Sequence, residues 1–139
     1  MIAALIGVSV GILTILAARA IRREPRLYAI GLLTLPSLYA FFALRVGDRS
    51  AAVEEVMYGL PYYVAGILFA FVRTRYSAVV IGSMWILHGV YDLVHSGFVS
   101  NAGVPDWYPA FCFSVDVVIG AYVLLRSRHL LDSGATAGP

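Results

Sequence analysis

Five apolar runs, separated by short polar links, dominate the pattern of hydrophobic and polar positions along the chain. They cover residues 2–18, 27–44, 53–72, 77–99 and 109–125. A helix needs about 20 mostly apolar residues to cross a bilayer. The runs do not alternate between apolar and polar residues, which argues against the strands of a barrel. The pattern therefore predicts an all-α integral membrane bundle of five transmembrane helices, formed as a single domain by residues 1–131.

The links and the two ends of the chain refine this prediction. Pro25, Gly47, Gly103 and Pro105 lie in the links, where such residues end helices. Residues 132–139 are mostly small and polar, so we expect them to form a disordered C-terminal tail. The first run resembles a signal peptide, but no positively charged segment precedes it. We therefore interpret it as a retained first helix.

The composition supports a membrane protein and excludes several classes of function. The chain is 60% hydrophobic and 13% charged, whereas about a quarter of the residues of a soluble domain are charged. All ten basic residues are arginine, which excludes the lysine Schiff base of a retinal pump. The net charge of +2 is then a signal of topology, and we expect no nucleic-acid partner. Cys112 is the only cysteine, so the chain has no internal disulfide.

The arginines predict how the chain is oriented, because basic residues concentrate in cytoplasmic loops. Eight of them lie in the first link, in the third link and after the fifth run, whereas the second link holds two and the fourth none. This bias places the N-terminus outside and the C-terminus in the cytoplasm of a multi-pass protein of the cell membrane. The eight are Arg19, Arg22, Arg23, Arg26, Arg73, Arg75, Arg126 and Arg128.

The fourth run carries a polar stripe. At about 100° per residue, Trp85, His88, Asp92 and His95 fall within an arc of roughly 80° on one face of a helix. Ionisable side chains are costly inside a membrane and mark functional sites by default. The alternative is that each histidine is a hydrogen-bonding residue of the bundle with its polar groups satisfied.

The predicted topology brings other polar residues to the same depth. Asp92 and Asp116 both lie roughly 10 Å below the outer surface, at 1.5 Å per residue, on consecutive helices that we expect to be neighbours. Several aromatic residues, a glutamate and the cysteine would line a cavity that opens towards the outer leaflet. These predicted substrate-binding residues are Trp85, Tyr91, Tyr58, Tyr62, Glu55, Tyr39 and Cys112.

The first functional hypothesis is acid–base catalysis on a lipophilic small molecule that enters from the membrane lipid. Asp92 and Asp116 would act as acid and base, because a buried carboxylic acid can protonate an alkene or epoxide. His88 and His95 would tune these groups or relay protons, and aromatic faces would stabilise a carbocation. The class would be an isomerase or cyclase of a terpenoid or sterol-like substrate, with no cofactor.

Two alternatives remain open. In the first, the ligands His88, Asp92, His95 and Asp116 hold zinc (Zn), and the protein is a zinc-dependent membrane hydrolase. In the second, the protein is a non-enzymatic transporter or binding protein for a proton, a metal ion or a small lipophilic solute. The predicted polar groups lie in one half of the membrane, so a transport path would require a homo-oligomer. The sequence does not fix the oligomeric state.

Two resemblances bear on these hypotheses. Residues 85–122 resemble an uncharacterised family of small, mostly bacterial integral membrane proteins that have a Trp-x2-His-x3-Asp-x2-His helix followed by Cys-x3-Asp. Many members have a further histidine where this chain has Ser96, which argues against a metal site. The matching positions are Trp85, His88, Asp92, His95, Pro105 or Pro109, Cys112 and Asp116.

The second resemblance concerns the pair His88 and Asp92. It is similar to the His-x3-Glu pair of the emopamil-binding-protein-like superfamily, with aspartate in place of glutamate. That superfamily includes sterol double-bond isomerases with a cavity inside the membrane. The resemblance therefore implies an isomerase or a cyclase.

Overall fold

The structure is a computed structural model that describes residues 1–139 except 22–23, 73, 75 and 136–139. Over these residues the chain is all-helical, with no strand. Four helical stretches are long and apolar enough to cross a membrane, namely Ile2–Ile21, Arg26–Arg45, Ser77–Gly97 and Tyr108–Ser127, which indicates a membrane protein. The elements are α1 (Ile2–Ile21), α2 (Glu24–Arg45), α3 (Arg49–Phe71), α4 (Ser77–Val94), the short 3-10 helix η1 (His95–Gly97) and α5 (Tyr108–Ala135).

The five predicted runs correspond to the five α-helices, with shifted ends. The run expected at 77–99 ends as an α-helix at Val94 and continues as η1. α5 extends past the predicted residue 125 to Ala135, where it overlaps the start of the expected tail, and residues 136–139 lie outside the described residues. α3 has 23 residues but is not among the four apolar stretches, since it begins at Arg49 and carries Glu54 and Glu55.

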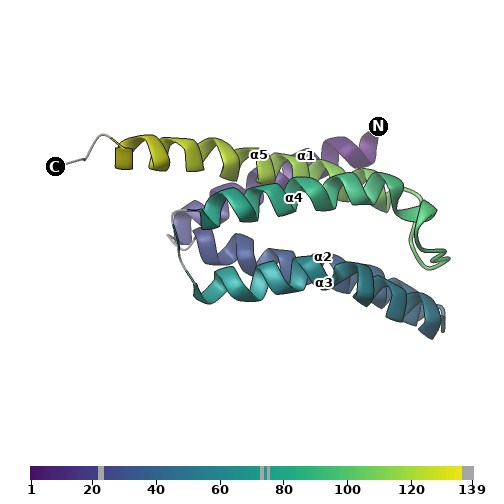
Figure 1. Ribbon diagram of the computed structural model, residues 1–139. Coiled ribbons are helices and arrows are strands. Elements are labelled where there is room, and N and C mark those ends of the chain that lie inside the picture. The colour runs from purple at the N-terminus through teal and green to yellow at the C-terminus, as the bar shows by residue number, and fades with distance from the viewer. Residues whose placement is uncertain (22–23, 73, 75, 136–139) are drawn as a thin grey trace.

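The helices form two layers. α4 packs against α5, and α5 packs against α1, whereas α2 packs most closely against α3. Figure 1 shows α1, α4 and α5 together, with α2 and α3 below them. The α2–α3 turn and the α4–α5 loop lie at the same end of the bundle, on the right of the view, opposite the C-terminus. We call this end the Gly47 end, after the glycine in the α2–α3 turn.

Local sequence explains the tight turn at the Gly47 end. Gly47 has φ of +80°, a left-handed conformation that glycine adopts without steric cost. The side chain of Asp48 then accepts a hydrogen bond of 2.9 Å from the backbone N–H of Ala51, which caps α3. The turn thus joins α2 and α3 as an antiparallel pair.

Glycines allow α4 and α5 to approach closely. A Cβ atom at Gly120 would lie 2.8 Å from the carbonyl oxygen of Gly82, and one at Gly89 would lie 3.1 Å from Cβ of Asp116. Real Cβ atoms rarely tolerate such contacts, so larger residues would push the two helices apart. The close approach places the polar face of α4 directly against Asp116 of α5.

The space between the layers has two different halves. Towards the C-terminal end of α5 it is filled by a buried apolar cluster that includes Leu32, Ile81, Trp85 and Ile119. Towards the Gly47 end it contains buried ionisable residues, which are Glu55, His88, Asp92, His95 and Asp116. The candidate site is therefore confined to one half of the bundle over the described residues.

Candidate acid–base site

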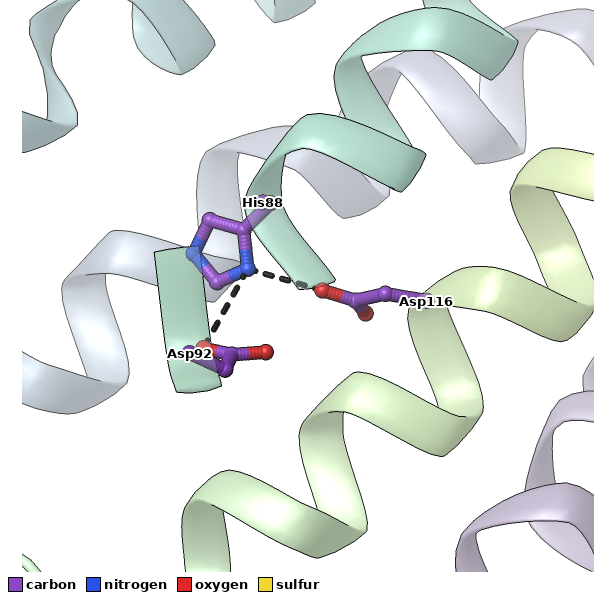
Figure 2. A group of neighbouring side chains, drawn as sticks. All are labelled: His88, Asp92 and Asp116. Atoms are coloured by element: carbon purple, nitrogen blue, oxygen red, sulfur yellow. Dashed lines mark hydrogen bonds and ion pairs between the residues drawn. The ribbon is translucent and has the colours of Figure 1, made fainter. Parts of the chain in front are cut away.

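His88 lies at the centre of the site, between two carboxylates. Its Nδ1 atom is 2.7 Å from Oδ2 of Asp116 and 3.6 Å from Oδ1 of Asp92. Figure 2 shows the imidazole with Nδ1 directed between the two side chains, Asp92 from its own helix and Asp116 from α5. The ring is therefore a shared partner that joins two carboxylates from different helices.

All three side chains are removed from solvent, with exposed fractions of 1% for His88, 2% for Asp92 and 0% for Asp116. An isolated charge would be expensive at such a position, but a buried carboxylate beside an imidazole has a compensating partner. The i, i+4 spacing of His88 and Asp92 brings them to one face of α4. The glycine contacts described above then bring α5 close enough for Asp116 to complete the group.

Tyr39 extends the group onto α2. Its hydroxyl donates a hydrogen bond of 2.8 Å to Oδ1 of Asp92. Among the residues that the structure describes, no hydrogen-bond partner meets the second oxygen of each aspartate, Oδ2 of Asp92 and Oδ1 of Asp116, or Nε2 of His88, and all three atoms are buried. Buried polar atoms without partners are rare in proteins and call for an explanation such as a catalytic role, water or an ion.

A second carboxylate–imidazole pair lies nearer the Gly47 end. Nε2 of His95 is 2.7 Å from Oε1 of Glu55, which joins η1 to α3. The side-chain amide of Asn101 donates to the same Glu55 oxygen at 2.8 Å and to the carbonyl oxygen of Tyr39 at 3.0 Å. Asn101 thus fastens the α4–α5 loop to both helices of the other layer.

Aromatic rings surround both pairs. The ring of Tyr62 meets the edge of the His88 ring at a centroid distance of 4.8 Å, and Tyr39 lies 4.3 Å from the ring of His95. The Tyr91 ring lies 6.0 Å from the His88 ring and 5.5 Å from that of His95. Such π-faces could stabilise a positive charge that develops close to them.

A pocket of about 450 Å³ opens at the Gly47 end. Asp92 and His95 line it from α4 and η1, and residues of the α4–α5 loop such as Asn101 and Asp106 form its other walls. Its volume lies within the range of ordinary small-molecule sites. We call His88, Asp92 and Asp116 the central group. Of these three residues Asp92 lines the pocket, whereas His88 and Asp116 do not.

The predicted catalytic residues thus fall into two groups in the structure. Asp92, Asp116 and His88 come together, whereas His95 pairs with Glu55, which the sequence placed at the mouth of the cavity.

None of the predicted substrate-binding residues lines this pocket. Trp85 points away from it, since its Nε1–H donates to the carbonyl oxygen of Tyr28 at 3.0 Å within the apolar cluster. Cys112 is buried beside Tyr39 and Tyr108. Tyr58 is 44% exposed, and its ring packs near those of Tyr91 and Phe98.

Sequence reasoning did not identify Asn101 and Tyr108 as site residues. Asn101 lies in a loop, where no helical periodicity shows which way a side chain points. Tyr108 is 6% exposed, and its ring lies 5.4 Å from that of Tyr39. No pattern in the sequence marks Asn101 as a site residue, because asparagine is common in turns and its side chain also accepts a local hydrogen bond from the backbone N–H of Gly103.

The central group also has the composition of a metal site. One donor atom from each of His88, Asp92 and Asp116 can be chosen so that all three lie within 4.8 Å of one another. The orphaned carboxylate oxygens fit either an ion or a proton at this place. His95, which the sequence placed in the same ligand set, is not a member of this group.

Comparison with known proteins gives no assignment of family or activity. The chain matches no protein-family model, no curated protein and no solved structure. The two resemblances in the sequence motifs therefore remain predictions.

Proposed function

We propose that the protein crosses the cell membrane five times, with its N-terminus outside and the site in the outer half. α3 supplies the fifth span, because its 23 residues reach about 35 Å and it lies antiparallel to α2. Eight of the ten arginines then lie on the cytoplasmic side. In this orientation the Gly47 end and the pocket face outwards.

The proposed activity is intramembrane acid–base catalysis on a lipophilic small molecule, as an isomerase or a cyclase. The observation that carries this proposal is the shared position of His88, between a fully buried carboxylate and one that lines a pocket. Groups that perturb one another in this way are typical of sites that transfer protons. A terpenoid or sterol-like alkene is the substrate class that suits a carboxylic acid beside aromatic rings.

In the proposed reaction each residue has a separate role. Asp92 faces the pocket, so its O–H bond breaks as a C–H bond forms on the substrate alkene, which leaves a carbocation. Tyr39 holds this carboxyl group in place through the hydrogen bond that its hydroxyl donates, whereas the rings of Tyr39, Tyr62 and Tyr91 do not line the pocket. A carboxylate oxygen of Asp92 then removes a proton from a neighbouring carbon, which forms a new double bond and restores the acid. His88 and Asp116 hold the balancing charge behind Asp92 throughout.

Deuterium incorporation tests this proposal. The purified protein would be incubated in D₂O with a panel of unsaturated isoprenoid and sterol lipids, and products would be analysed by mass spectrometry. We expect at least one lipid to gain deuterium at carbon, and Asp92→Asn to reduce that gain by at least a hundredfold. Glu54→Gln is the control, because Glu54 is an exposed carboxylate of α3 that does not line the pocket and should retain activity. Undiminished incorporation by Asp92→Asn would refute the assignment.

A zinc-dependent hydrolase is the second candidate, favoured by the three donors within 4.8 Å. His88, Asp92 and Asp116 would hold the ion, and a bound zinc supplies an activated water for hydrolysis. Elemental analysis after purification without chelators tests it. One zinc per chain, lost in Asp116→Asn and retained in Glu54→Gln, would support this candidate. Metal at trace level in the wild-type protein would exclude it.

A further inference from the structure

The pair formed by Glu55 and His95 has no part in the chemistry proposed above, yet it is buried and closely paired like the central group. Glu55 is 2% exposed and His95 is 4% exposed, so neither is a surface residue. The two side chains approach to 2.7 Å from α3 and η1, and Asn101 holds the same glutamate oxygen from the loop. Three separate elements therefore fix a second imidazole beside a second carboxylate.

Tyr39 connects this pair with the central group. Its ring lies 4.3 Å from the His95 ring at an interplanar angle of 30°, and its hydroxyl donates to Asp92. Its carbonyl oxygen accepts a hydrogen bond from Asn101. Asp92 and His95 also line the same pocket, which at about 450 Å³ has room for water. The two groups therefore share both a bridging tyrosine and a common space.

The central group needs a route for protons to and from the surroundings. Its three members are at most 2% exposed and only Asp92 lines the pocket, so protons reach the group from the pocket side. In the proposed turnover Asp92 gives one proton to the substrate and regains another from a different carbon. If Asp92 loses its proton to water between turnovers, the acid must be restored from the surroundings. Imidazole is the side chain best suited to exchange protons near neutral pH.

We propose that Glu55 and His95 form a proton relay between the outer pocket and Asp92, an inference that rests on the proposed function. The His95 imidazolium gives its proton through pocket water to the carboxylate of Asp92, so that an N–H bond breaks and an O–H bond forms. The neutral imidazole then takes a proton from a hydronium ion at the mouth of the pocket, which leaves a water molecule. The Glu55 carboxylate stabilises the imidazolium, and Asn101 keeps Glu55 in place. The other groups that face His95 are Tyr39 and Tyr91.

Hydrogen–deuterium exchange of the central carboxyl groups tests the relay without any substrate. Infrared spectroscopy of the purified protein, at a pH acid enough to show the C=O band of protonated Asp92 or Asp116, would follow the band shift after transfer to D₂O. Loss of the band in Asp92→Asn or Asp116→Asn assigns it. We expect His95→Gln to slow the exchange at least tenfold and Glu55→Gln to slow it as well. Glu54→Gln, an exposed neighbour on α3, should leave the rate unchanged.

Chemical rescue separates a relay from a structural role. In His95→Ala, imidazole added to the buffer should enter the pocket and restore the exchange rate. If His95 only supported the packing of its neighbours, free imidazole would not restore that rate. Wild-type exchange in His95→Gln, or slow exchange in His95→Ala that imidazole does not restore, would overturn the relay. Neither result depends on turnover, so the deuterium-incorporation test of Asp92 decides the proposed function independently.

Discussion

The two halves of the space between the helix layers have opposite chemistry, although α2 to α5 contribute residues to both. In one half, Ile81, Trp85 and Ile119 form part of an apolar cluster. In the other, His88 and Asp116 belong to a buried polar network on the same two helices, α4 and α5. One turn of helix separates Asp116 from Ile119 and Trp85 from His88. The contrast indicates that burial alone does not set the free-energy cost of a charged group, because that cost also depends on the polar partners around the group.

The largest expected effect comes from moving a carboxylate across this boundary. Ile119 is 1% exposed, like Asp116, but its neighbours are apolar. Ile119→Asp buries a carboxylate without a partner, and we expect a loss of about 3–5 kcal/mol in the free energy of unfolding. Unfolding in detergent, followed by circular dichroism, measures it. Ile119→Val is the control, with an expected loss of about 1 kcal/mol. Equal stability of the two variants would show that the apolar half tolerates charge.

Removing a carboxylate from the polar half should cost less. Glu55→Leu takes away the shared partner of His95, which is buried, and of Asn101, which is half-buried. We expect a loss of about 1–3 kcal/mol, the usual penalty for an unsatisfied buried polar group. The same unfolding measurement detects it. A Glu55→Leu variant that is as stable as the wild type would mean that this network contributes nothing to the fold.

The smallest expected effect concerns Trp85, which lies at the boundary. Trp85→Phe keeps an aromatic ring in the apolar cluster but removes the hydrogen bond to the carbonyl oxygen of Tyr28. We expect a loss of about 1 kcal/mol in unfolding free energy. Proton exchange at the central carboxyl groups should stay at the wild-type rate. A large change in that exchange would place Trp85 in the site, as the sequence pattern suggested.

Helical periodicity predicted the elements and one wall of the site. The apolar runs indicated the all-helical fold, and the i, i+4 spacing placed His88 and Asp92 on one face of α4. The predicted topology placed Asp92 and Asp116 at the same depth in the membrane. In the structure, donor atoms of these two residues and of His88 lie within 4.8 Å of one another.

Periodicity could not show which residues pair across helices. The stripe suggested that Trp85 and His95 act with His88, but rotation of the chain at the end of α4 turns His95 towards Glu55. Trp85 instead meets α2 where Gly31 leaves room for its ring. The role of Asn101 depends on the path of the α4–α5 loop, which no pattern of apolar residues encodes.

Nitrogen-15 NMR of the histidine side chains tests the central claim most directly, namely that His88 is shared by Asp92 and Asp116 while His95 belongs to Glu55. The chain has three histidines, so each resonance can be assigned by its loss in a His→Gln variant. We predict that Asp116→Asn shifts the His88 nitrogen resonances and leaves those of His95 unchanged, whereas Glu55→Gln does the reverse. His88 resonances that stay in place in Asp116→Asn would contradict the account.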